Sequence, residues 1–297
     1  MVAVEKNLNP PKGIALVILA FLGFSIMSAF IKLCSNTGLD IHEIMFFQNL
    51  IALIIVLPWV FHGKKVSLKP QYPLLVFGRV ITGLISMYFY FVAIKFVPLV
   101  DATLLQNTTP IFIPIIAFFV FRKKITLKMW TVMIVGFIGV TMVLHPGKGA
   151  VNPGDLIALL SGFFSGLSTV IIKLLDDKNE SEKLIIFWFL AFTTISMGIW
   201  ALADWTTPVG NAWLYLIGAG VFMALFQLLL IFAVKYASTT TISPFIYLSV
   251  VFSGFIDWIV WNQIPTLLTV FGATVVIASA IISALHHTKH NIPVHHK

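Results

Sequence analysis

Long apolar runs separated by short polar loops dominate this chain. Each run is close to the ~20 residues that an α-helix needs to cross a hydrocarbon layer ~30 Å thick. The runs predict ten transmembrane helices, at residues 14–34, 41–61, 73–94, 100–120, 127–144, 155–175, 183–203, 211–233, 240–261 and 267–285. The loops are too short for a soluble domain, so the pattern predicts an all-α integral membrane protein that works inside its helix bundle.

Composition agrees with this prediction. Of the 297 residues, 59% are hydrophobic and 10% are charged, whereas a soluble domain is about 25% charged. The net charge of +8 could indicate a nucleic-acid partner, but the basic residues gather in alternate loops. With the N-terminus in the cytoplasm, all of them lie on the cytoplasmic side except Lys32, Lys95, Lys148 and the intramembrane Arg79. This follows the positive-inside rule and predicts an inner-membrane protein with both termini cytoplasmic and no nucleic-acid partner.

The chain repeats itself at a nearly constant offset. Gly13, Leu19 and "IKL" at 31–33 recur as Gly154, Leu160 and "IKL" at 172–174. We interpret residues 1–148 and 149–297 as two copies of a five-helix unit. Five is odd, so the second copy enters the membrane from the opposite side, as in secondary transporters whose inverted halves enclose a site near the midplane. The alternative is a duplication that supplied structural bulk alone.

The stretch "DATLLQNTTPIFIPI" at 101–115 places polar residues inside an apolar run. On a continuous helix, one side would carry Thr103, Gln106, Asn107, Pro110 and Pro114. The matching run at 240–261 has a comparable stripe of Ser243, Tyr247, Gly254 and Asp257. Polar groups at membrane depth face a cavity or another helix, so these two stripes predict cavity walls. The alternative is hydrogen bonding that only packs helices together. The prolines, Pro244 included, are expected to interrupt their helices.

Arg79 lies several residues inside its predicted span, and Asp257 is the only acid well inside one. Arg79 needs a partner, which is either a carbonyl or carboxylate of the protein or an anionic group on a substrate. Asp257 could bind a cation, accept a proton for coupling, or satisfy neighbouring groups. The predicted topology places Arg79 toward the cytoplasm and Asp257 in the outer third, so we do not expect them to pair directly.

Other residues supplement these candidates. Tyr90 belongs to a set of aromatic residues that could line an aromatic box, with Tyr88, Trp188, Trp258 and Trp261. Gln227, Gln48 and Asn49 are further candidates for the cavity wall. Gly162 and Gly166 form a GxxxG pattern that would suit a homodimer. The single cysteine, Cys34, excludes a metal site built from cysteine pairs, and we expect no metal and no cofactor.

The stretch "GRVITGLISMYFYFVAIKFVPLVDATLLQNTTPIFIPIIAFFVF" at 78–121 resembles the third and fourth helices of EamA-type members of the drug/metabolite transporter superfamily. "FAVKYASTTTISPFIYLSVVFSG" repeats the likeness more loosely in the second half. The resemblance implies a ten-helix basket around a central cavity and substrates such as amino acids or nucleotide derivatives. It also implies cavity roles for Gln106, Asn107, Ser243 and Tyr247.

The chain departs from the family pattern at two places. Where members usually have a glutamate at the end of the fourth and ninth helices, it has "FRKKIT" and "WNQIPT". Where many carry an arginine in the second helix, it has Gln48 and Asn49. Its arginine-led third helix is similar to that of members that take up S-adenosylmethionine.

Three functions were weighed against these features. A secondary carrier for a small polar or amphipathic metabolite, working by alternating access, accounts for the repeat and for the polar stripes. An intramembrane enzyme would need a nucleophile, metal ligands or paired acids at membrane depth, and a non-transporting membrane subunit would need no polar stripe. The sequence favours the carrier, with Asp257 as its coupling residue.

Substituting both Gln106 and Asn107 with alanine should abolish transport without unfolding the protein, because the amides would contact the solute. Flux into vesicles and the elution profile of the detergent-solubilised variant measure the two effects. Unaltered flux in the folded variant would refute this site.

Overall fold

The computed structural model of the chain describes residues 9–62, 67–121, 127–143, 152–236 and 243–290. Helices account for nearly all of these ranges, and no strand occurs within them. The first half contains α1 (Pro10–Ser35), α2 (Ile41–Phe61), α3 (Pro73–Phe96), α4 (Leu99–Gln106), α5 (Thr109–Phe121) and α6 (Leu127–Val143). The second contains α7 (Pro153–Asp177), α8 (Glu182–Ala201), α9 (Ala212–Tyr236), the 3-10 helix η2 (Ser243–Tyr247), α11 (Leu248–Trp261) and α12 (Leu267–His290).

Seven helical stretches in the described part are long and apolar enough to cross a membrane. They are Pro11–Ser35, Ile41–Phe61, Pro73–Phe96, Leu99–Val120, Pro153–Asp177, Glu182–Ala201 and Ala212–Ala233. Three shorter apolar stretches, Met133–Met142, Phe245–Trp261 and Leu267–Ser279, coincide with the other predicted spans. Large apolar side chains such as Leu74, Phe119 and Ile259 lie on the outside of the bundle, as a hydrocarbon solvent requires.

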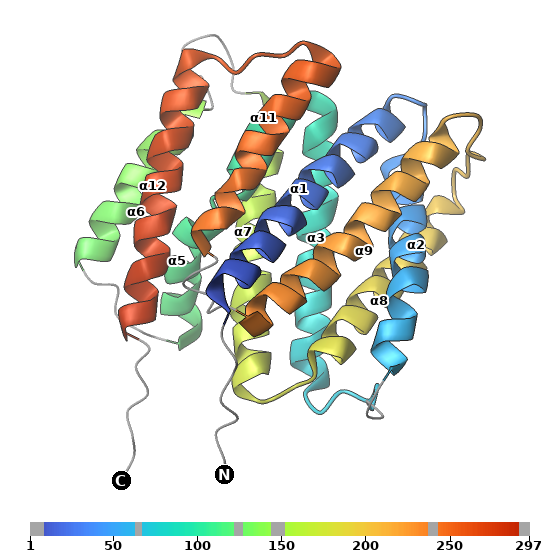
Figure 1. The fold of residues 1–297 in the computed structure, drawn as a ribbon, viewed down its shortest axis with the longest axis horizontal. Helices are drawn as coiled ribbons and strands as arrows, with labels where there is room; N and C mark the ends of the chain where they lie inside the picture. Colours follow the sequence, from blue (N-terminus) through green and yellow to red (C-terminus); the bar gives the residue numbers. More distant parts are fainter. Residues whose placement is uncertain (1–8, 63–66, 122–126, 144–151, 237–242, 291–297) are drawn as a thin grey trace.

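The helices of the two halves pack against each other in a reciprocal way. α1 lies along α9, and its counterpart α7 lies along α3; α2 packs on α8, and α6 packs on α12. Figure 1 shows α5, α6 and α12 on one flank and α2, α8 and α9 on the other, with α1, α3, α7 and α11 between them. The beginning of α1 and the end of α12 lie at the same end of the bundle (Figure 1).

Polar residues at the loop ends start several helices. Asp40 and Glu43 form a capping box at the start of α2, so two backbone amides without helical partners are satisfied. Asn152 accepts a hydrogen bond from the Gly154 amide, and Pro153 begins α7 where a missing N–H costs nothing. These short signals fix where each apolar run enters its helix.

The run predicted as one helix at 100–120 is broken in the structure. α4 ends at Gln106, Asn107 caps it, and α5 begins at Thr109. The expected interruption thus occurs just before Pro110, which is the second residue of the new helix, whereas Pro114, also expected to interrupt its helix, lies inside the continuous α5. Pro110 has no N–H for the Gln106 carbonyl, and the Thr109 hydroxyl donates to that carbonyl instead, at 2.9 Å. The break thus leaves this carbonyl satisfied.

The described part of the matching run at 240–261 is helical throughout but changes helix type. It starts as the 3-10 helix η2, which contains Pro244, and becomes α-helical from Leu248. A wheel drawn for two regular α-helices therefore does not apply across the break after Gln106 or within η2. Thr108, which that wheel directs away from the stripe, is buried in the turn, and its hydroxyl donates to the Leu105 carbonyl.

Two glycines of α7 let this helix lie against the break. A Cβ on Gly162 would lie 2.7 Å from the Leu105 carbonyl oxygen, and one on Gly166 would lie 3.2 Å from the Ile116 side chain. Thr109 also donates to the Gly162 carbonyl. The GxxxG face is thus used within the chain and is not free for a second copy. A homodimer stays a prediction that must rest on another face.

The substitution Gly162→Ala should lower the free energy of unfolding by about 1–3 kcal/mol, because its Cβ would meet backbone oxygens that cannot move aside. Gly78→Ala is the control, since its Cβ would come no closer than 3.7 Å to a neighbour, Ile171. Thermal unfolding in detergent compares the two variants. Equal unfolding temperatures would show that α7 does not depend on close contact at the break.

Candidate functional site

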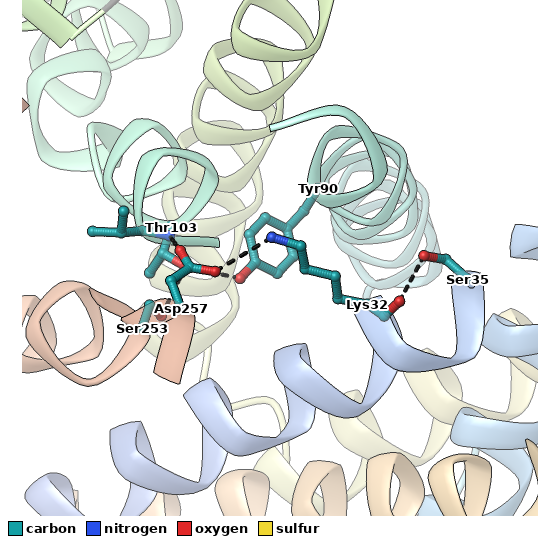
Figure 2. Close-up of polar contacts among 7 residues, drawn as sticks. Lys32, Ser35, Tyr90, Thr103, Ser253 and Asp257 are labelled. Carbon is teal, nitrogen blue, oxygen red and sulfur yellow. Dashed lines mark hydrogen bonds and ion pairs between the residues drawn. The ribbon is translucent and has the colours of Figure 1, made fainter. Parts of the chain in front are cut away.

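A cluster of hydroxyl groups joins helices of the two halves in the interior. The Thr103 hydroxyl of α4 lies 3.0 Å from that of Tyr90 on α3 and 3.1 Å from that of Ser253 on α11. Tyr90 also donates to Ser28 of α1, at 3.0 Å. All four side chains are buried. Figure 2 shows Tyr90, Thr103 and Ser253 converging beside an ion pair. We call Ser28, Tyr90, Thr103 and Ser253 the hydroxyl cluster.

That ion pair links Lys32 of α1 to Asp257 of α11, with 3.3 Å between Nζ and Oδ1. The other carboxylate oxygen of Asp257 accepts a hydrogen bond from the Val100 amide at 2.7 Å (Figure 2). Val100 is in the first turn of α4, where amides lack helical partners and negative charge is favourable. The Lys32 ammonium also lies 4.5 Å from the centre of the Trp261 ring. One fully buried carboxylate therefore holds three helices together.

This arrangement decides part of what the sequence left open for Asp257. The residue pairs with Lys32 and not with Arg79, as expected from their separation along the membrane normal. Lys32, counted on the outer side from the sequence, is a buried residue of α1. Its place inside the predicted span 14–34 was the signal for its burial. Asp101, in the first turn of α4, is a further acid within a predicted span.

A second polar level lies about one helical turn away. The Asn107 amide donates to the Ser249 hydroxyl at 2.8 Å, and the Ser249 carbonyl accepts from Ser25 of α1 at 3.1 Å. Ser253 in turn lies 3.4 Å from Ser25, which connects this level to the hydroxyl cluster. The polar side chains thus form a continuous seam between α1, α4 and α11. Ser25, Ser28 and Ser249 were not predicted, because single serines in apolar runs resemble packing residues.

Several predicted residues place side-chain polar atoms in the interior without a partner among the described residues. Besides Arg79, Gln48 and Asn49, they include Gln106, through its side-chain Oε1, and Tyr247, through its hydroxyl. Such groups cost free energy unless water or a ligand satisfies them. Gln106 ends α4 and Tyr247 ends η2. Both atoms therefore have hydrogen-bonding capacity that no described residue uses.

The remaining predicted residues are placed as follows. Gln227 is half-buried on α9. The side chains of Pro110 and Ser243 lie outside the described part. The aromatic candidates make separate contacts: Tyr88 stacks on His42, Trp188 donates to the Leu68 carbonyl, Trp261 lies under Lys32, and Trp258 is exposed. Only Tyr90 belongs to the seam.

Arg79 lies on α3, more than one helical turn after the first residue of the helix, Pro73. Its Nε and Nη1 atoms are buried and make no hydrogen bond with the described residues. The guanidinium carbon lies 4.3 Å from the centre of the Phe189 ring of α8. An arginine at membrane depth costs ~2.5–3.5 kcal/mol on insertion scales, and a single cation–π contact offsets only part of this.

An apolar groove of about 560 Å³ lies between α11 and α12. Val250, Trp258 and Ala273 are among its lining residues. It has few polar groups to orient a polar solute, so the seam and not this groove is the candidate site. Within the described ranges, no three His, Cys, Asp or Glu side chains are grouped so that they could hold a metal ion.

The packed apolar helices with a buried polar seam define a multi-pass membrane protein. Residues 11–145 and 152–285 each match the EamA-like transporter family, and the chain belongs to that family. It is therefore a membrane transporter for small molecules.

Several relatives are similar over nearly their whole length. The chain is 28% identical to the pseudopaline exporter of Pseudomonas aeruginosa over 93% of this chain and 96% of that protein. It is 27% identical to a riboflavin transporter of Vibrio cholerae (95% of each chain) and 28% identical to an S-adenosylmethionine uptake transporter of Rickettsia prowazekii (94% and 93%). A solved crystal structure has the same fold, with a TM-score of 0.64 at 16% identity, over 95% of this chain and 99% of that one.

Removing either partner of the Lys32–Asp257 pair should destabilise the protein by about 3–5 kcal/mol, because the other charge would stay buried alone. Removing both, as in the double variant Lys32→Met with Asp257→Asn, should cost less than the sum of the single substitutions. Unfolding of the wild type, both single variants and the double variant gives the coupling energy. Strictly additive effects would show that the two groups do not interact.

Proposed function

We propose that the chain is a secondary transporter that moves a small polar or amphipathic metabolite across the inner membrane by alternating access. The amino acids and nucleotide derivatives are the expected substrate class. The relatives include transporters named for riboflavin and for S-adenosylmethionine, both of which are small polar metabolites with a ring system. One named relative is an exporter and another is an uptake transporter, so the relatives leave the direction of transport open.

The observation that carries this proposal is the seam itself. It joins α1, α3 and α4 of the first half to α11 of the second half, through Thr103, Ser253, Lys32 and Asp257. In the proposed mechanism, residues 1–148 and 149–297 are inverted halves that rock around this contact. Polar pairs can separate and reform as water or solute replaces them, whereas a seam of interlocked apolar side chains would have to be repacked.

The solute would bind along the seam. Gln106 and Tyr247 offer free polar atoms, and Asn107, Thr103 and Tyr90 offer groups that can exchange their present partners for a solute. Pro110, Ser243, Arg79 and Gln227 complete the proposed binding residues. Asp257 is the proposed coupling residue.

The predicted topology places the ion pair near the outer end of the proposed transport path. With cytoplasmic termini, α1 and α11 both run outward, and Lys32 and Asp257 each stand in the last turns of their helices. In this proposal the pair would close the outer side of the transport path. Protonation of Asp257 would cancel the attraction to Lys32 and free α1 from α11.

Purified protein in liposomes tests both parts of this proposal. Uptake of riboflavin, S-adenosylmethionine and a mixture of amino acids is followed by mass spectrometry from acidic to neutral pH. We expect at least one solute to enter protein-containing vesicles and not protein-free ones, and we expect Asp257→Asn to flatten the pH dependence of its uptake. Absence of uptake of every solute would contradict this substrate class, and an unchanged pH profile would remove Asp257 from coupling.

A further inference from the structure

The geometry points to Arg79 as the group that binds a carboxylate of the transported solute, so that the substrates are small organic acids or zwitterions. This inference rests on the proposed function and narrows its substrate class. It uses three observations: an intramembrane cation without a counterion, a contact surface that fixes its orientation, and neighbouring polar atoms without partners.

The first observation is the contrast between two buried cations. Lys32 has its counterion within the chain, at 3.3 Å in Asp257. None of the ion pairs in the described part of the chain involves Arg79. Its Nε and Nη1 are buried, so a free donor remains on both edges through which a guanidinium binds a carboxylate. A protein that supplies a counterion for one cation and leaves the other unpaired has a place for an anion from outside.

The second observation is how the guanidinium is held. Its carbon lies 4.3 Å from the centre of the Phe189 ring, so the cation is held over that ring. Gly83, one turn along α3, leaves the space that the group occupies: a Cβ there would lie 2.4 Å from Nη1 and 3.1 Å from the Phe189 ring. Phe189 and Gly83 are therefore positioning residues. They hold the guanidinium while Nε and Nη1 keep their hydrogen-bonding capacity.

The third observation lies further along the same helices. Thr193 stands one turn beyond Phe189 on α8, is fully buried, and its hydroxyl makes no hydrogen bond within the described ranges. Gln48 lies on α2, the helix packed on α8, and is fully buried. Neither its Oε1 nor its Nε2 makes a hydrogen bond with a described residue. Thr193 thus has an unused hydroxyl one turn from the Phe189 contact, and Gln48 has an unused amide on the helix that packs against α8.

Charge balance selects the class of solute. A neutral solute could satisfy the donors of Arg79 but would leave its charge uncompensated in a medium of low dielectric constant. A carboxylate satisfies the donors and compensates the charge together. Binding should therefore prefer an acid over the carboxamide of the same shape.

Thermal unfolding of the purified full chain tests this preference with four matched pairs of probes. They are acetate and acetamide, succinate and succinamide, benzoate and benzamide, and L-phenylalanine and L-phenylalaninamide. We expect at least one acid to raise the unfolding temperature of the wild type more than its amide does, since ligands stabilise the state that they bind. In Arg79→Met the affinity for that acid should fall by about 10- to 100-fold, while the unliganded variant unfolds at the same or a higher temperature, because an unpaired buried charge is gone.

A second variant separates charge from position. Gly83→Ala keeps the charge but displaces the flexible end of Arg79, so it should weaken the preference for the acid with little loss of stability. Gly78→Ala, whose Cβ has no close neighbour, should behave as the wild type. Equal effects of acid and amide on the wild type, or an acid preference that survives in Arg79→Met, would overturn the inference. An unliganded Arg79→Met protein that unfolds well below the wild type would also overturn it, since that indicates a structural role. In these cases, continued uptake by the wild type in liposomes would leave the transporter function standing.

Discussion

The arrangement of the interior depends on a carboxylate that is withdrawn from water. Asp257 has no exposed surface, so its charge must be compensated by groups that the fold brings to it. Lys32 comes from α1 and the Val100 amide from the start of α4, which are remote from Asp257 in sequence. Loss of either contact would leave an uncompensated charge in the bilayer. The contact therefore fixes the positions of three helices relative to one another. The hydroxyl cluster beside it links α3 to the same three helices.

Hydrogen-bond satisfaction also explains why the fourth span can be broken inside a membrane. Backbone groups that lose their helical partners at a break cannot hydrogen-bond to water at that depth. The threonine hydroxyls beside Pro110 take up the carbonyls at the end of α4, and the glycine of α7 brings its own carbonyl within reach of Thr109. The polar residues within this apolar run thus have two roles. Some complete the backbone at the break, and others, such as Gln106, keep a polar atom free.

The sequence predicted the spans well because hydropathy at a fixed length is imposed by the bilayer itself. It predicted Asn107, Thr103, Tyr90 and Asp257 as interior polar residues for the same reason. It could not predict the partners, because pairing depends on helix order and rotation, which hydropathy does not encode. Lys32 was counted on the outer side since it stands near a span end, where snorkelling to the interface is equally favourable. The break at Asn107 was missed because a proline is compatible with either a kink or a new first turn.

The break has a mechanical consequence. α4 is held by the ion pair and the hydroxyl cluster, whereas α5 packs on α7 and α12. Because threonine hydroxyls and three-residue turns, and not an unbroken α-helical ladder, satisfy the carbonyls at the junction, the two segments are connected as by a joint. A tilt of α5 together with its neighbours on the flank need not be transmitted along the helix axis to the ion pair. A continuous helix would transmit a tilt from one side of the membrane to the other. In this chain, the break between α4 and α5 interrupts that transmission.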